Sequence, residues 1–249
     1  MDDPVFVGAH RGDERWLAVA FDRDGLEEAV VLDGVGDVWG RYDERAARIL
    51  VDVPVGLVEE GTDERRCDAL TRAALGPRAD AVVPPPVREA TRKRRYPVAD
   101  RTHERRTGRG LSRRAFARSD AVAAVDDLLG EVPEARDRVA ESNPELCFRA
   151  LAGEPLAHPR RVAAGYAERM RTLAEFDPEA APTVQSAAES TDGAEVTVAD
   201  VLDAVVLGYA ARPGPGSLRS LPADPPTDAT GLPMRTCYRS EAPIDPEVS

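Results

Sequence analysis

The sequence predicts an α/β fold in which a mixed sheet, built from an antiparallel three-strand meander plus parallel strands, is flanked by helices. Three short runs of strand-like composition open the chain, at 4–9, 15–22 and 26–33. A nearly continuous apolar run at 49–57 is typical of a strand buried on both faces of a sheet. Segments with helical spacing fill most of the remainder, so strands and helices are expected to share one core.

Length and composition favour a single domain, residues 1–249. A chain of 249 residues with 42% hydrophobic content can bury a substantial core. We expect a basic insertion at about 79–118 and a proline-rich tail from about 213, with one short strand in the tail at 232–238.

The elements of the first half follow from local signals. The turn signal at 23–25 separates the second and third runs, which favours an antiparallel hairpin. A helix is expected at about 42–48, before the buried strand. Another is expected at 63–75, because acidic residues lie early and Gly76-Pro77 ends the pattern. The stretch 79–111 is expected to be irregular.

The second half is expected to be mostly helical. The spacing predicts, in order, a helix at 112–129, a short strand at 137–141, and helices at 145–152 and 160–175, while 178–195 shows no clear pattern. The run at 197–211 is apolar on nearly every face, which predicts a buried helix. Its first residues, Thr197 and Asp200, form a capping-box pattern.

The charge balance is strongly acidic. The chain has 45 Asp and Glu against 33 Lys and Arg, a formal net charge of −12, and Lys93 as its only lysine. This composition is typical of salt-adapted, halophilic proteins, in which a carboxylate-rich surface stays hydrated. At molar salt the Debye length falls to about 3 Å, so the acidity does not exclude a nucleic-acid partner.

The cysteines and the N-terminus indicate a cytoplasmic protein. Cys67, Cys147 and Cys237 have neither disulfide nor zinc-knuckle spacing, which favours a reducing compartment. The N-terminal run MDDPVFVGAH has no basic region followed by a long apolar stretch. No segment approaches the roughly 18 apolar residues of a membrane span, so no membrane partner is expected.

Four carboxylates are candidate site residues. Asp52 lies within the buried run, where an ionised carboxylate is costly unless a metal or a hydrogen-bond donor satisfies it. Glu141 follows the predicted short strand. Asp203 lies on the apolar helix, and Asp200 precedes it by one turn but has a competing role in the capping box. For Asp52 the plain alternative is a hydrogen-bond acceptor for a neighbouring loop.

These carboxylates are the type of ligand that a divalent-metal site requires. Mg²⁺ and Mn²⁺ prefer oxygen ligands, and a pair of such ions about 3.5–4 Å apart can cleave a phosphodiester. We therefore expect Asp52, Glu141 and Asp203 as catalytic residues, with Asp200 as a further metal ligand.

A second signal is a basic segment at 88–118. It holds twelve basic and three acidic residues, a local net charge of +9. Such a segment on an acidic protein suggests phosphate contacts, from nucleic acid or a nucleotide. The expected substrate-binding residues are Arg88, Arg92, Arg94 and Arg113. The alternative is that these arginines pair with carboxylates of the protein itself.

Several motifs together resemble domain-of-unknown-function family 429. They include Gly8 and Trp16 around the first strand, the Asp52-x-Pro54-x-Gly56-Leu57 strand end, the Arg66-Cys67-Asp68 helix start, the Gly108-x-Gly110-Leu111-Ser112 approach, and the Asp200-x-x-Asp203-Ala204 helix. Two positions depart from the family pattern. His10 occupies the place of a first-strand aspartate, and Asn143 the place of a histidine after Glu141.

The resemblance implies a ribonuclease H-like fold and a metal-dependent nuclease or other phosphodiester hydrolase. Because a neutral imidazole cannot replace the charge of an aspartate, His10 opens an alternative. In that alternative the chain is a non-catalytic nucleic-acid or nucleotide-binding module of the same fold. A phosphotransfer enzyme is a third possibility, which is disfavoured because the sequence has no GxxxxGK phosphate loop.

Overall fold

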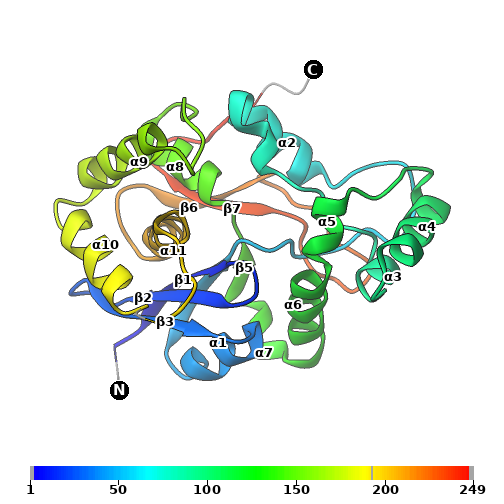
Figure 1. The fold of residues 1–249 in the computed structure, drawn as a ribbon, viewed down its shortest axis with the longest axis horizontal. Coiled ribbons are helices and arrows are strands. Elements are labelled where there is room, and N and C mark those ends of the chain that lie inside the picture. The colour runs from blue at the N-terminus through cyan, green and yellow to red at the C-terminus, as the bar shows by residue number, and fades with distance from the viewer. Residues whose placement is uncertain (1–2, 192, 247–249) are drawn as a thin grey trace.

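The computed structural model describes residues 3–191 and 193–246 (Figure 1). Its centre is a five-stranded sheet with the strand order β3-β2-β1-β4-β5. The strands are β1 (Val5–Arg11), β2 (Trp16–Phe21), β3 (Leu26–Leu32), β4 (Ala46–Val51) and β5 (Val139–Glu141). Strands β1, β2 and β3 pair antiparallel, while β4 pairs parallel with both β1 and β5. The predicted mixed sheet, with its meander and its parallel strands, is confirmed.

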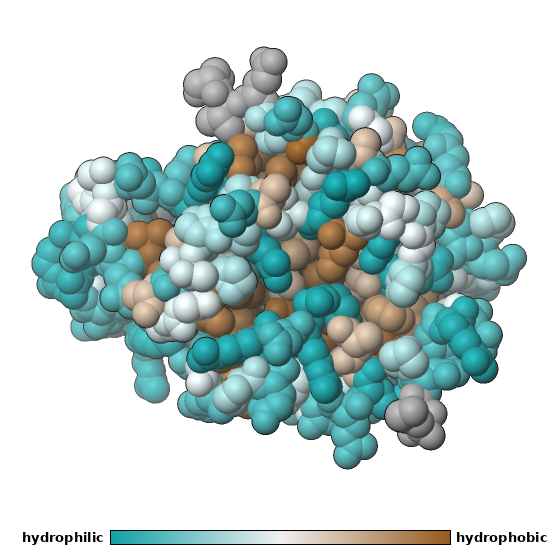
Figure 2. All heavy atoms as spheres, turned by 180° about the vertical axis from the view of Figure 1, so that it is seen from behind, coloured by the Kyte–Doolittle hydropathy of each residue, from teal (hydrophilic) through white to brown (hydrophobic). Residues whose placement is uncertain are grey.

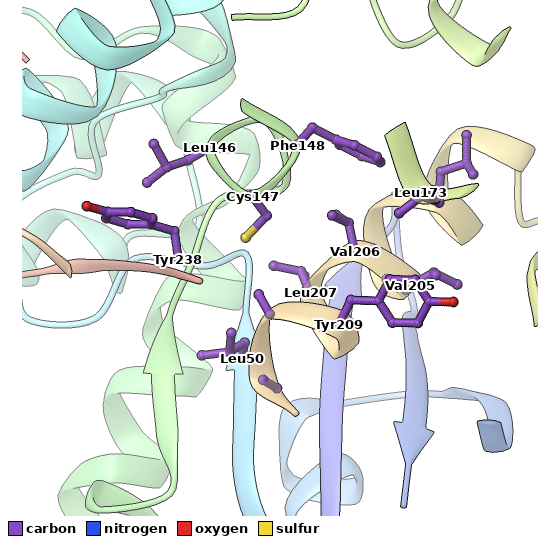
Figure 3. Packing of buried hydrophobic residues seen from close by; sticks show 14 of the residues in the cluster. Leu50, Leu146, Cys147, Phe148, Leu173, Val205, Val206, Leu207, Tyr209 and Tyr238 are labelled. Carbon is purple, nitrogen blue, oxygen red and sulfur yellow. The ribbon is translucent and has the colours of Figure 1, made fainter. Parts of the chain in front are cut away.

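Helices cover both faces of this sheet. One face packs against α1 (Val35–Tyr42), α6 (Ser119–Glu131) and α7 (Pro133–Arg136). The other packs against α11 (Val198–Ala211), α8 (Pro144–Ala152), α9 (Ala163–Phe176) and α10 (Ala180–Glu189). Figure 3 shows the packing of the second face, where Val206 and Leu207 of α11 lie between the sheet and the side chains of α8. As predicted, α11 is buried on nearly all sides.

The remaining elements lie beside the sheet. They are α2 (Arg66–Leu75), the 3₁₀ helix η1 (Gly76–Ala81), α3 (Arg88–Thr91), α4 (Tyr96–Thr107), α5 (Arg113–Ala117) and the two-stranded sheet of β6 (Ser217–Leu221) and β7 (Thr236–Ser240). Helices α3, α4 and α5 form the right-hand side of Figure 1. No helix in the described ranges has the length and apolar character that a membrane span requires.

The side-chain alternation of β1 decides what lies on each face. Val5, Val7 and Ala9 belong to the core beneath α1 and α6. Because successive strand residues point to opposite faces, Gly8 and His10 face α11 instead. Hydrophilic residues cover most of the molecular face in Figure 2, and hydrophobic residues show between them near its centre.

Three predicted elements are wrong in place or kind. The helix expected at 42–48 lies at α1, because Val35, Val38 and Tyr42 supply the buried stripe, and β4 already begins at Ala46. The stretch expected to be irregular holds η1, α3 and α4; Pro97 lies in the first turn of α4, where its missing N–H costs nothing. The tail strand is β7, and its partner β6 was not predicted.

In two other segments the structure shows helices whose bounds the sequence pattern did not predict. The helix predicted at 112–129 is two helices, α5 and α6, which meet at Arg118. The stretch at 178–195, which showed no clear pattern, contains α10.

Candidate functional site

A cleft of about 410 Å³ opens where the parallel strands of the sheet end. His10 near the end of β1, Asp52 directly after β4 and Glu141 at the end of β5 all line it. The first turns of α11 add Asp200 and Asp203. In open α/β sheets this carboxyl edge is where ligands bind. The structure thus brings all four predicted carboxylates to one cleft.

A close contact between β1 and α11 positions the centre of the cleft. A Cβ atom on Gly8 would lie 2.2 Å from both the carbonyl oxygen of Ala204 and the backbone nitrogen of Gly208, so only glycine allows the two backbones to approach this closely. His10 is two residues further on the same face of β1. The contact therefore holds the imidazole against the N-terminal turns of α11.

His10 lies between carboxylates. Its Nδ1 is 2.8 Å from Oδ2 of Asp52, in an ion pair whose angle is poor for a hydrogen bond, and 4.0 Å from Oδ2 of Asp203. Its Nε2 is 3.2 Å from Oδ1 of Asp200. Burial acts to lower the pKa of His10, but the charge of Asp52 and the hydrogen bond to Asp200 outweigh it and raise the pKa to about 10. His10 is therefore an imidazolium at neutral pH.

Asp52 is an acceptor for several donors. It accepts the backbone N–H of Arg11 at 2.8 Å, and Nη2 of Arg118 lies 3.4 Å from its Oδ2. Burial would raise the pKa of Asp52, but the charges of His10 and Arg118 hold it well below its usual range. The carboxylate is therefore ionised and paired with cations.

Asp200 combines the two roles that its sequence position suggested. Its Oδ2 completes the capping box, accepting the backbone N–H of Thr197 at 2.9 Å and the Thr197 hydroxyl at 2.7 Å. Its Oδ1 faces His10 at 3.2 Å and Nη2 of Arg160 at 3.5 Å. Asp203, one turn on, accepts a hydrogen bond from Nη1 of Arg160, and burial raises the pKa of Asp203.

Glu141 belongs to a neighbouring buried cluster. Its Oε2 accepts the backbone N–H of Val55 at 2.8 Å and a hydrogen bond from Nη2 of Arg65. Nη1 of Arg65 lies 3.5 Å from Oδ1 of Asp68. Burial raises the pKa of Glu141 to about 7, although the charge of Arg65 opposes the rise. Glu141 therefore points to Arg65, while Asp52, Asp200 and Asp203 surround His10.

The donor set can be compared with the needs of Mg²⁺ or Mn²⁺. Such ions require several oxygen atoms converging on one point at about 2.0–2.6 Å. Around His10, three carboxylates already face three cationic groups, namely His10, Arg118 and Arg160. In this arrangement the residues do not fit a two-ion centre, because the imidazolium lies between the carboxylates that would share the ions.

A different trio has ligand atoms close enough for a metal ion among the described residues: Cys67, Asp68 and Glu141. Arg65 lies within that trio and pairs with both of its carboxylates. The guanidinium thus supplies the positive charge that a metal ion would bring.

None of the four predicted substrate-binding arginines is among the residues that line the cleft. Nitrogen atoms of Arg88 lie 2.8 Å from Glu59 and 3.0 Å from Asp126, and Arg88 also bonds Asp228. Arg92 lies 2.7 Å from Asp126 and also pairs with Asp127. The guanidinium of Arg113 lies over the Tyr96 ring at 4.4 Å, and Arg94 is exposed. Arg88 and Arg92 therefore follow the alternative interpretation, in which the arginines pair with carboxylates of the protein itself.

Five other arginines line the cleft: Arg11, Arg114, Arg118, Arg160 and Arg161. Sequence reasoning did not select them as site residues. Arg114 and Arg118 lie within the basic segment, so a helical count through α5 would have placed them together. No local signal marks Arg11 or the Arg160-Arg161 pair, because their position at the cleft depends on how the end of β1 and the loop after α8 are packed.

A family model described as "Protein of unknown function (DUF429)" matches residues 3–227. Searches of the curated proteins and of the solved structures both found no match.

Proposed function

Since the chain belongs to the DUF429 family of proteins of unknown function, we propose its function from the cleft itself: a ribonuclease H-like module that binds the phosphates of a nucleic acid or nucleotide without cleaving them. Five arginines and an imidazolium lie around a cleft of about 410 Å³. Guanidinium groups bind phosphate oxygens in a bidentate manner, which favours this ligand class over a neutral one.

The proposal depends on a difference among the five cleft arginines: two of them have carboxylate partners among the described residues and three do not. Arg11 and Arg114 donate to the main-chain carbonyls of Gly12 and Asp80, and Arg161 is exposed. Within the ranges 3–191 and 193–246, no carboxylate lies within ion-pair distance of these three arginines, whereas Arg118 and Arg160 have carboxylate partners. Three guanidinium groups at one cleft, without an ion-pair partner in these ranges, remain available to an anionic ligand.

The internal neutralisation of the carboxylates supports binding rather than turnover. His10, Arg118 and Arg160 balance Asp52, Asp200 and Asp203, so these three carboxylates at the centre of the cleft are already neutralised, while Asp13 and Glu195 also line it. The protein is proposed to act in a reducing compartment such as the cytoplasm, which is supported by its three free and buried cysteines.

A second candidate is the metal-dependent phosphodiester hydrolase that the sequence suggests. The observation that favours it is the meeting of Asp52, Asp200 and Asp203 around a single point. This candidate requires that Mg²⁺ or Mn²⁺ displace the imidazolium of His10, and the donor set described above opposes that.

Binding of labelled single- and double-stranded DNA and RNA, measured by fluorescence anisotropy over a range of KCl concentrations, tests the first candidate. Arg114→Ala and Arg161→Ala should weaken binding, and each should reduce the slope of log affinity against log salt by about one unit if the arginine contacts a phosphate. Arg94→Ala is the matched control, because it removes the same charge from an exposed position outside the cleft. Equal losses in all three variants would contradict a specific cleft.

The same oligonucleotides, incubated with and without Mn²⁺, separate the two candidates. The binding module leaves them intact in every condition. Mn²⁺-dependent cleavage by the native protein that Asp52→Asn abolishes would instead establish the hydrolase.

A further inference from the structure

A second cavity, of about 210 Å³, lies next to the cleft and has a different character. Its walls are mainly apolar and come from the proline segment, the end of α4 and the start of α5. The wall residues that matter here are Val58, Pro84, Pro85, Leu111 and Ala115. His103 and Ser112 add polar atoms to this lining.

The two cavities share their walls. Asp68 lines both of them. Residues 81–83 line the cleft, and the chain then continues as Pro84 and Pro85 along the second cavity. The start of α5 is divided in the same way, since Arg114 lines the cleft and Ala115 the cavity. A ligand whose two parts are joined by a few bonds can therefore occupy both.

The polar atoms of the shared wall have spare hydrogen-bonding capacity. Nε and Nη1 of Arg65 and Oδ2 of Asp68 have no hydrogen-bond partner among the residues that the structure describes. All three atoms are fully buried behind the surface of the cavity, and Nη1 of Arg65 lies 3.5 Å from Oδ1 of Asp68. Elsewhere in the lining, Nδ1 of His103 accepts the backbone N–H of Val87 at 3.2 Å, so Nε2 is the nitrogen that carries the proton of the neutral ring.

We propose that this second cavity is a nucleobase subsite, which holds the base of a nucleotide whose phosphate lies among the cleft arginines. The proposal rests on the proposed phosphate-binding function and names the ligand more closely. A nucleobase has flat apolar faces and edges that carry both donors and acceptors, which suits mainly apolar walls with a few polar side chains such as His103 and Ser112. A second phosphate does not suit the cavity, because its walls are mainly apolar and Arg65 already pairs with Glu141 and Asp68.

Comparison of nucleoside 5′-monophosphates with ribose 5-phosphate tests the subsite, because the two ligands share sugar and phosphate and differ only in the base. Isothermal titration calorimetry of the full-length protein should give at least one nucleotide a roughly tenfold or greater advantage in affinity over ribose 5-phosphate. Equal affinities would overturn the base subsite while leaving phosphate binding intact. Binding of neither ligand would overturn both proposals.

Gly110→Leu blocks the cavity at a lining position. A Cβ atom there would meet only Oδ1 of Asp100, at 3.7 Å, so the backbone accepts a side chain at this position without a clash at its first carbon. Nucleotide affinity should fall to that of ribose 5-phosphate, whose own affinity should not change. Gly130→Leu is the matched control, because Gly130 is an exposed helical glycine away from both cavities. A Gly110→Leu protein that folds and keeps its nucleotide preference would also overturn the subsite, and the comparison in the native protein remains decisive if the variant does not fold.

Discussion

At the scale of single residues, the chemistry of the cleft depends on His10. An aspartate at this position would add a fourth negative charge beside Asp52, Asp200 and Asp203, and such a group needs cations from solution. The imidazolium instead supplies a positive charge from within the chain, and it is held on both ring nitrogens. With His10, three cations face three carboxylates; with an aspartate in its place, four carboxylates would face only Arg118 and Arg160.

The ion pairs of His10 predict a pH dependence of stability. The folded-state pKa of about 10 lies above the ordinary value of 6.5. A raised pKa stabilises the folded state fully below the unfolded-state pKa, and the contribution is lost as the pH rises toward the folded-state value. The difference in unfolding free energy between the native protein and His10→Gln should therefore shrink between about pH 6.5 and pH 10.

Urea denaturation at a series of pH values checks this expectation. His158→Gln serves as the control, because His158 is exposed and its substitution should give a small difference at every pH. A His10→Gln difference that stays constant across this range would show that the ring is neutral in the folded protein.

At the scale of elements, the site depends on how closely β1 approaches α11. Gly8 supplies this approach from the strand. Gly208 allows α11 to approach β2 as well, since a Cβ atom there would lie 2.4 Å from the ring of Phe21. Gly8 holds the strand that carries His10 against the helix that carries Asp200 and Asp203. The strand end and the helix start would otherwise be too far apart for the hydrogen bond between His10 and Asp200.

Gly8→Ala should therefore destabilise the protein by about 3 kcal/mol or more, since the clash is with backbone atoms that cannot rotate away. Gly36→Ala is the matched control. Gly36 is an exposed glycine of α1 with open space around its Cβ position, so alanine there should stabilise the helix by about 0.5–1 kcal/mol. Chemical denaturation of both variants measures the two values. A Gly8→Ala protein as stable as the native one would mean that the strand and helix can separate at little cost.

At the scale of the whole molecule, the charges are less segregated in space than in the chain. The segment 88–118 has a local net charge of +9, but Arg88, Arg92 and Arg106 pair with acidic side chains inside and outside it. Arg88 also ties the C-terminal loop to this segment through Asp228, 140 residues away. Much of the basic segment therefore holds the fold together, and a smaller part of it reaches the cleft.

The net charge of −12 predicts a response to salt. Because most exposed carboxylates repel one another, we expect the midpoint of thermal unfolding to rise as KCl is increased from low concentration toward molar. Circular dichroism melting curves measure this midpoint. KCl is preferable to a sulfate salt, since sulfate strengthens the burial of apolar surface by itself. A midpoint that falls with KCl would mean that the internal ion pairs outweigh the surface repulsion.

The sequence by itself determined the elements whose signals are local. Runs of strand-like composition and the turn signal at 23–25 identified the strands of the meander, the apolar run identified β4, and the Thr197 and Asp200 pattern identified the start of α11. These signals also placed Asp52 and Glu141 at strand ends, because a strand's end is visible in its own residues. The prediction of a helix at 42–48 was wrong, because the apolar side chains that a helix can bury there lie earlier in the chain, at Val35, Val38 and Tyr42.

Only the tertiary structure decided which charges meet. His10 and Asp200 are 190 residues apart in the chain, and Glu141 pairs with Arg65 across 76 residues. Such pairings depend on the path of every intervening element, and no spacing rule in the sequence encodes them. The carboxylates could therefore be predicted from the sequence. The cations that neutralise them could be identified only from the tertiary structure, and these cations decide the character of the site.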